Sequence, residues 1–293
     1  MANSDDDQAS DNAPGQDAPD QNIPGGFNFL NDLRLAFLLL TRIPVVSRGQ
    51  MLMGQAARAA WAFPIVCVVV GAAGGLVFLG ANHLGIGLAG ATLLAISVQV
   101  LITGALHEDG LADTADGFGG GRDREQKLAI MRDSRIGTYG VVALMLAFGL
   151  RFSAINELAN SLISTSDEYD QTVSNTSAVA VTLIAAGALS RVAMAAVWYL
   201  LPPARSDGLA LSCGKIPLAS VIAAGLVSSL VTFGLLDGES WGVTIAAVAV
   251  AAFFMYALAK RQIGGHTGDV LGATQQIAEI AALLAISAVT VAI

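Results

Sequence analysis

Long apolar segments, each close to twenty residues, constrain this chain more than any other feature. Seven of them lie near 61–81, 89–106, 139–156, 178–200, 218–236, 242–259 and 277–293. A helix rises 1.5 Å per residue, so segments of about this length cross a hydrocarbon core of about 30 Å. Charged residues make up only 13% of the 293 residues, about half the fraction in ordinary soluble domains. We therefore expect an all-α, polytopic integral membrane protein, a helical bundle of about seven spans.

The N-terminal part of the chain differs from this pattern. Residues 1–26 carry six aspartates and no basic residue, and they are rich in Asn, Gln, Pro and Gly. This composition is typical of a disordered acidic tail, so residues 27–293 are expected to form a single helical transmembrane catalytic domain. The segment 29–46 is apolar but short and contains Asp32; it is either an eighth span or a helix lying in the membrane interface. No basic stripe is present, which argues against a nucleic-acid partner.

Basic and base-free loops alternate along the chain. Lys and Arg occur in the loops near 42–60, 107–138 and 201–217 and at the start of 260–276, and the intervening loops carry none. Basic loops face the cytoplasm in membrane proteins. We therefore expect a multi-pass protein of the cytoplasmic membrane whose polar motifs, and hence any active site, lie on the cytoplasmic face.

The richest polar segment runs from His107 to Gly117. Asp109, Asp113 and Asp116 stand at i, i+4 and i+7 and would share one face of a helix. Three such carboxylates repel one another unless a cation lies among them, and their hard oxygens suit Mg²⁺. The alternative is a solvated acidic helix face. His107 is a candidate base or ligand beside this cluster, and Glu108 points elsewhere on the helix, where a surface acid is the simplest interpretation.

A basic segment follows the acidic one. Arg132 and Arg135, which would be one helical turn apart, are candidates to clamp phosphate oxygens. Asp133 and Ser134 between them suggest a further metal contact or an orienting pair. Anchoring at the cytoplasmic surface is the alternative function for the basic residues. Acids beside phosphate-binding arginines are the parts needed for phosphoryl transfer, and the absence of GxxxxGK[ST] in the sequence excludes a P-loop enzyme.

Further candidates lie in the second half of the chain. Arg191 falls near the middle of a span, where a charge usually faces a polar cavity, so it binds phosphate or pairs with an acid. The turn containing Gly265, Thr267 and Gly268 exposes backbone N–H groups of the kind that bind anions. Asp269 follows this turn and is either a second metal ligand or a helix N-cap.

Taken in order, these motifs resemble the cobalamin synthase family, the adenosylcobinamide-GDP ribazoletransferases, over residues 27–293. The motifs that carry the resemblance are Thr41-Arg42-Ile43-Pro44, Phe63-Pro64, the stretch from His107 to Gly117, the stretch from Ile130 to Thr138, Ser190-Arg191, Ala204-Arg205, Gly264-Gly265, Thr267-Gly268-Asp269 and Leu271-Gly272-Ala273. Two positions depart from the family pattern. Glu108 stands where the family commonly has an apolar residue, and Gln276 stands where relatives often have a glutamate.

The resemblance implies the last assembly step of the cobalamin nucleotide loop. A hydroxyl of α-ribazole, or of its 5′-phosphate, attacks adenosylcobinamide-GDP, GMP leaves and a phosphodiester forms, with Mg²⁺ required. The implied roles fall into three groups. Metal ligands would be Asp109, Asp113, Asp116 and Asp269. Catalytic residues would be Arg132, Asp133, Arg135, Arg191 and His107. Substrate-binding residues would be Arg42, Ser134, Gly265, Thr267 and Gly268.

Two other functions fit part of the pattern. A CDP-alcohol phosphotransferase is also a helical membrane enzyme with several aspartates, but here Asp109-Gly110 leads to Ala112-Asp113, without the arginine of that motif. A transporter would place ionisable groups near the membrane midplane, as Arg191 and Glu279 are placed. The oligomeric state is left open, a homo-oligomer included.

Overall fold

The computed structural model describes residues 28–45, 54–163, 171–205 and 213–292. The predicted acidic tail lies outside them. Helices account for about four-fifths of the described residues and no strand occurs among them, so the all-α prediction is confirmed. The elements are α1 (Phe29–Leu40), α2 (Gln55–Ala59), the 3₁₀ turn η1 (Ala60–Ala62), α3 (Phe63–His83), α4 (Leu88–Thr103), α5 (Leu106–Gly120), α6 (Arg124–Ile130), α7 (Thr138–Ile163), α8 (Gln171–Leu200), α10 (Leu218–Phe233), α11 (Gly238–Ile263) and α12 (Gly268–Ala292).

Among the described residues, five helical stretches are long and apolar enough to cross a membrane, which supports the polytopic class. They are Gln55–His83, Thr138–Ser161, Ser177–Leu200, Gly238–Ile263 and Gly268–Val291. The range 89–106 corresponds to α4, which joins α5 through a bend of 88°, and the pair makes a sixth span if the two are counted together. The range 218–236 corresponds to α10, an apolar helix of 16 residues.

Helix α1 is too short to be a span by itself. Its 12 residues extend about 18 Å, well below the thickness of a hydrocarbon core. It is fixed to the next helices through Asp32, which is fully buried and accepts hydrogen bonds from Arg58 Nη2 (3.0 Å) and Trp61 Nε1 (3.2 Å). Of the two predicted alternatives for the segment 29–46, the length of α1 favours the interfacial helix.

The break between α4 and α5 lies at Gly104 and Ala105. Both residues have left-handed backbone conformations, with φ of 65° and 57°. For alanine this conformation is uncommon and costly, and such residues concentrate at functional sites. The break lets α5 leave the direction of α4 and cross α12.

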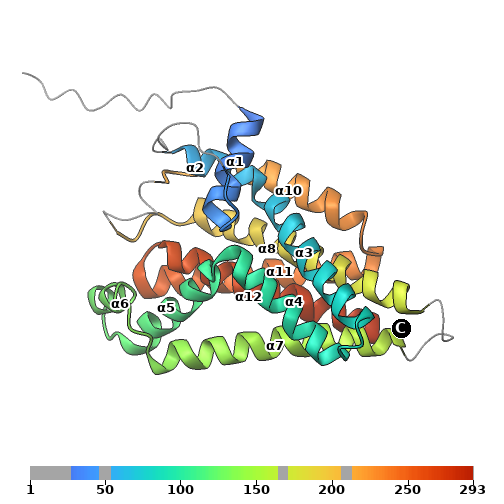
Figure 1. Ribbon diagram of the computed structural model, residues 1–293. Coiled ribbons are helices and arrows are strands. Elements are labelled where there is room, and N and C mark those ends of the chain that lie inside the picture. Colours follow the sequence, from blue (N-terminus) through green and yellow to red (C-terminus); the bar gives the residue numbers. More distant parts are fainter. Residues whose placement is uncertain (1–27, 46–53, 164–170, 206–212, 293) are drawn as a thin grey trace, which may run out of the picture.

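The polar segments of the chain gather at one end of the bundle (Figure 1). This end carries α6, the C-terminal half of α5, the start of α7 and the junction between α11 and α12, whereas the C-terminus of the chain lies at the opposite end. The loop after α8 joins the same cluster, because Ala204 N donates to His266 O and His266 N donates to Pro202 O, each at 2.8 Å. Segments separated by well over a hundred residues therefore line one face.

Candidate active site

Helix α5 carries the acidic motif, as the i, i+4, i+7 spacing predicts. Along it the three aspartates differ in environment: Asp109 is exposed, Asp113 is half-buried and Asp116 is buried. Few large apolar side chains belong to this helix, so its packing depends on glycine and alanine contacts and on polar contacts. The positions of the three acids therefore depend on the neighbouring helices and loops that contact α5.

The crossing of α5 over α12 brings a fourth carboxylate to the acidic cluster. A Cβ atom at Gly110 would lie 2.8 Å from the carbonyl oxygen of Asp269 and 3.2 Å from the Cα of Gly272. Only glycine allows so close an approach of two backbones. Asp269 thus comes to the same side as Asp109 and Asp113. Its predicted role as a further metal ligand requires this placement.

Asp269 lies in the first turn of α12, which begins at Gly268, nine residues before the predicted start of the last span. It is therefore part of the helix, and the residue that caps the helix is Thr267. The hydroxyl oxygen of Thr267 accepts from the Val270 N–H at 3.2 Å, and the hydroxyl donates to Asp269 Oδ2 at 3.2 Å. The N-cap alternative for Asp269 is wrong for this reason, and the carboxylate remains directed toward the cluster.

Arg205 is the cation that faces these carboxylates. Its Nη1 atom lies 4.0 Å from Asp269 Oδ2, and it acts electrostatically on Asp113 as well, opposing the negative charges of Asp109, Asp269 and Asp116. Arg205 was not among the predicted site residues and appeared only in the Ala204-Arg205 motif. The available signal was a basic residue in a loop predicted to face the same side as the acids.

Asp116 anchors the start of α7. Its Oδ2 atom accepts from the Gly137 N–H at 2.7 Å and its Oδ1 atom accepts from the Gly140 N–H at 2.8 Å. A Cβ atom on either glycine would lie 2.4 Å from a carboxylate oxygen. Both oxygens of Asp116 therefore satisfy backbone donors that a helix N-terminus leaves open. Its predicted role as a metal ligand stays a prediction.

The basic segment does not form the predicted helical turn. Residues 131–137 lie between α6 and α7, outside any helix, so Arg132 and Arg135 are not stacked one turn apart, because α6 ends at Ile130. Arg135 folds back on Asp133 instead, with Arg135 Nη2 2.5 Å from Asp133 Oδ2. This hydrogen-bonded pairing lowers the pKa of the Asp133 carboxyl to about 2. Arg132, Ser134 and Arg135 are exposed at the same end as the acidic cluster.

Two other basic residues of this region hold α6 against α11. Arg124 Nε donates to the carbonyl oxygen of Ile263 at 2.9 Å, and Lys127 Nζ donates to Gln262 Oε1 at 2.5 Å. Cations at the C-terminal end of a helix are favoured by its dipole. These residues therefore have a packing function in addition to the predicted surface anchoring.

The glycine turn before α12 packs tightly on the loop after α8. A Cβ atom at Gly265 would lie 2.4 Å from the carbonyl oxygen of Pro202. The next residue, His266, forms a single parallel β-bridge with Pro203. Burial lowers the pKa of His266 to about 4, so this histidine is neutral near pH 7. Gly268 is exposed beside the cluster, and Thr267 is buried as the cap; an anion-binding role for the turn stays a prediction.

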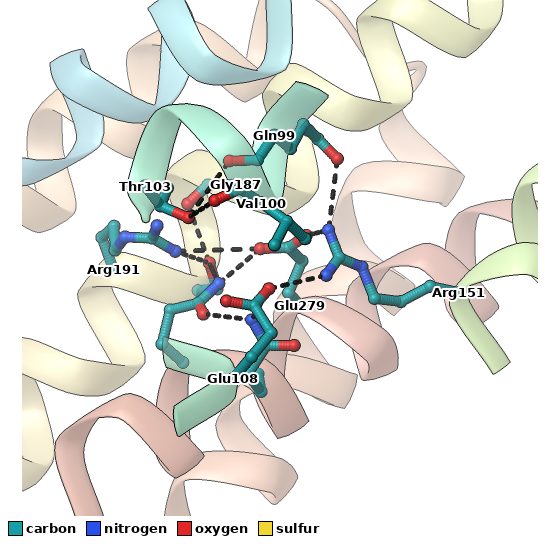
Figure 2. Close-up of polar contacts among 11 residues, drawn as sticks. Gln99, Val100, Thr103, Glu108, Arg151, Gly187, Arg191 and Glu279 are labelled. Atoms are coloured by element: carbon teal, nitrogen blue, oxygen red, sulfur yellow. Dashed lines mark hydrogen bonds and ion pairs between the residues drawn. The ribbon is translucent and has the colours of Figure 1, made fainter. Parts of the chain in front are cut away.

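His107 and Arg191 lie apart from the surface cluster, around a polar cavity inside the bundle. Glu108, Arg151 and Glu279 line the same cavity, and all five side chains are less than a tenth exposed. Figure 2 shows Arg151 and Arg191 approaching Glu279 from opposite sides, with Glu108 beside Arg151. Arg191 pairs with an acid, one of its two predicted alternatives, at 3.8 Å from Glu279; catalytic roles for His107 and Arg191 stay predictions.

Glu108 is a member of this buried network and not a surface acid. Its Oε1 atom accepts from Arg151 Nη1 at 3.1 Å and from Gln276 Nε2 at 3.0 Å. Arg151 Nη2 in turn lies 3.0 Å from Glu279 Oε1. The surface interpretation fails because α5 enters the bundle at this point, which the local sequence pattern does not reveal.

Arg42 lies against the break between α4 and α5. Its backbone N–H donates to the carbonyl oxygen of Ile102 at 2.6 Å, and its side chain occupies the space beside Gly104. The residue is exposed. Its predicted role in substrate binding is compatible with this position and stays a prediction.

The carboxylates of the cluster fit a magnesium ion by donor type. Asp109, Asp113 and Asp269 offer hard oxygen ligands from two crossing helices, and a cation would relieve their mutual repulsion. Within the part of the chain that the structure describes, no three His, Cys, Asp or Glu side chains are gathered into a ready metal site. These carboxylates would therefore have to move closer together to hold a metal ion.

Comparisons with known proteins agree on one family. The model of the family described as cobalamin-5-phosphate synthase matches residues 32–287. Proteins named adenosylcobinamide-GDP ribazoletransferase are similar over most of the chain. The one from Bradyrhizobium diazoefficiens is 47% identical, over 89% of this chain and 95% of its own length. The one from Sinorhizobium medicae is 44% identical, over 88% and 97%. No solved structure matches the chain.

Proposed function

This chain belongs to the cobalamin-5-phosphate synthase family, and we propose that it joins α-ribazole, or its 5′-phosphate, to adenosylcobinamide-GDP. The protein is a transferase of the adenosylcobinamide-GDP ribazoletransferase type and acts in the final assembly of the cobalamin nucleotide loop. The observation that carries this assignment is the extent of the match. Identity above 40% covers nearly nine-tenths of the chain, and residues 32–287, which the family model matches, include every motif at the polar end of the bundle.

The reaction exchanges one phosphorus–oxygen bond for another. A ribose hydroxyl oxygen of α-ribazole forms a bond to the cobinamide-side phosphorus, and the bond from that phosphorus to the GMP oxygen breaks. The hydroxyl proton passes to a carboxylate of the cluster or to water. Little covalent work is asked of the protein in such a transfer, so catalysis depends on positioning and on neutralising the developing charge.

Arginines at the polar end of the bundle would bind the diphosphate. Arg132, Arg135 and Arg205 come from two loops on the side where Asp109 and Asp113 lie. Arg135 is paired with Asp133 at the exposed surface, and exposed pairs contribute little to stability. Exchanging this carboxylate for a substrate phosphate therefore costs little free energy, and Arg135 is suited to binding and releasing substrate.

Asp109, Asp113 and Asp269 would hold Mg²⁺, with Asp116 next to them as the anchor of α7. When bound, this ion neutralises negative charge on the diphosphate and on the leaving GMP. Thr267 orients Asp269 through its hydroxyl hydrogen bond, and the Gly110 contact holds the two helices together. The protein's own contribution is thus the placement of carboxylates from two helices around one position.

The proposed location is the cytoplasmic membrane, with the active site on its cytoplasmic face. The alternation of basic and base-free loops supports this orientation, and the basic loops lie at the end of the bundle that carries the acidic cluster. Water-soluble GMP would then be released on the cytoplasmic side. A corrin substrate anchored near the membrane surface would reach the same face.

The test is product analysis with the purified protein in detergent. Adenosylcobinamide-GDP and α-ribazole are supplied with Mg²⁺, and adenosylcobalamin and GMP are measured by mass spectrometry. We expect both products in equal amounts, and we expect neither after chelation with EDTA until Mg²⁺ is restored. A folded protein that forms neither product with Mg²⁺ present would overturn the proposal, and CDP-linked donors would then be tried.

A further inference from the structure

Helix α5 has few of the apolar anchors that hold the other long helices in place. Of its three large apolar residues, Leu106 is 42% exposed, Leu111 is buried and Phe118 is partly buried against the core, and much of the remainder is Gly, Ala, Thr and acids. In a membrane bundle, helices of this composition associate through close backbone packing and polar contacts. The position of the catalytic acids along and around α5 must therefore be set by specific polar ties.

One such set of polar contacts lies in the bundle interior, at the residue that precedes the acids in sequence. Glu108 immediately precedes Asp109 and accepts hydrogen bonds from Arg151 of α7 and Gln276 of α12, at 3.1 Å and 3.0 Å. Arg151 also forms an ion pair with α12, because its Nη2 atom lies 3.0 Å from Glu279 Oε1 (Figure 2). A single carboxylate thus connects α5 to α7 and α12, two of the helices that it packs against.

A second tie lies at the other end of the acidic segment. Asp116 accepts from the backbone N–H groups of Gly137 and Gly140 at the start of α7. Glu108 meets α7 at Arg151, eleven residues further along that helix, so α5 and α7 run antiparallel with two points of attachment. Asp109 and Asp113 lie between these two points.

We propose that Glu108 is a positioning residue for the transfer reaction: its contacts with Arg151 and Gln276 fix the height and rotation of α5, and so place Asp109 and Asp113 against Asp269. This inference rests on the proposed function. Glu108 itself lies inside the bundle, at 6% exposure, and acts through the acids that follow it.

The charges of the network explain why the tie is specific. Glu108 and Glu279 balance Arg151 and Arg191, so the buried set is neutral when both acids are ionised. Buried ion pairs are weak sources of stability compared with apolar packing, but removing one partner alone leaves an uncompensated charge. Loss of the Glu108 charge would therefore draw Arg151 toward Glu279 and release α5.

The experiment compares matched variants of the full-length protein in the product assay. E108Q keeps the shape of the side chain and removes its charge, and E157Q makes the same change at an exposed position of α7. We expect kcat of E108Q to fall about 100-fold, the scale of a misplacement near 1 Å, with KM for adenosylcobinamide-GDP little changed because the exposed arginines are untouched. E157Q should match the wild type.

A swap variant separates positioning from a general folding defect. In E108Q/Q276E the acid moves across the 3.0 Å contact between the two side chains, so the network keeps its charge and the hydrogen bond is reversed in direction. We expect this variant to recover most of the kcat that E108Q loses. If E108Q does not fold, the folded swap variant decides the matter by itself.

A folded E108Q with wild-type kcat would overturn the inference. So would a folded E108Q/Q276E that is as inactive as a folded E108Q, or that is inactive where E108Q does not fold. A loss confined to KM would also contradict it, because it would assign Glu108 to substrate binding. These results are distinct from a failure of the proposed function, in which the wild-type protein itself forms neither adenosylcobalamin nor GMP.

Discussion

At the scale of single residues, the site depends on carboxylates whose surroundings differ sharply. Asp116 is committed to two backbone N–H groups, whereas Asp113 lies among Asp109, Asp116 and Asp269, with Arg205 as the opposing cation. Like charges gathered in this way destabilise the folded protein, and functional sites retain them because they hold a cation. A substitution at Asp113 should therefore affect stability and activity in the most different ways.

Replacing Asp113 with Asn should lower the rate of adenosylcobalamin formation by about 100-fold or more, since the proposed Mg²⁺ site would lose a charged oxygen ligand. The thermal unfolding midpoint in detergent should stay the same or rise, because repulsion among the acids decreases. D237N is the control: Asp237 caps α11, and Asn caps helices as well as Asp. Near-full activity of D113N at ordinary Mg²⁺ concentrations would remove Asp113 from the site.

At the scale of helices, the crossing of α5 and α12 assembles the site. The acids of α5 and Asp269 are separated by more than 150 residues in sequence, and the glycine contact at Gly110 and Gly272 brings their helices together. A side chain at this crossing would force the helices apart. The resulting displacement would change the distances between the carboxylates of the two helices. It would change the positions of the exposed arginines much less.

Replacing Gly110 with Ala should therefore reduce kcat by roughly tenfold to 100-fold, because the new methyl group would lie 2.8 Å from the Asp269 carbonyl oxygen. G149A in α7 is the matched control, since a Cβ atom there meets nothing within 4 Å. Its activity should equal that of the wild type. Equal activity of G110A and G149A would show that the crossing distance is not important for the transfer.

At the scale of the whole molecule, the two ends of the bundle carry different kinds of residues. The acidic cluster, the glycine turn and the arginine loops share one end, and the opposite end carries the turns between α3 and α4 and between α10 and α11. This polarity is what a membrane enzyme needs to act on soluble nucleotides. It agrees with the alternation of charge in the loops.

The orientation can be measured with single cysteines in a protein whose own Cys67 and Cys213 are replaced by Ala. Arg122 and Gly238 are both exposed. Arg122 lies just before α6 and Gly238 begins α11, and these helix starts lie at opposite ends of the bundle (Figure 1). A membrane-impermeant maleimide applied to intact cells should label G238C, and it should label R122C only after permeabilisation. Detergent-solubilised protein should be labelled at both positions. The reverse pattern in intact cells would place the active site on the outer face.

The sequence by itself determined the fold class, the family and the approximate helices, because apolar length and local motifs are properties of contiguous residues. Each of the five described helical stretches that are long enough to span overlaps a predicted range, with bounds that differ by up to nine residues, and the acidic motif is helical as its spacing predicts. Family membership, inferred from the ordered motifs, is confirmed by the comparisons.

Only the tertiary structure decided which polar residues meet. Arg205 faces Asp269, Glu108 meets Arg151 and Gln276, and Arg135 turns to Asp133 rather than stacking with Arg132. The physical reason is that partners of a buried charge come from other helices, whose rotation and depth depend on the packing of the whole bundle. Periodicity places a residue on its own helix, whereas the bend at Gly104 and Ala105 and the crossing at Gly110 determine what that residue touches.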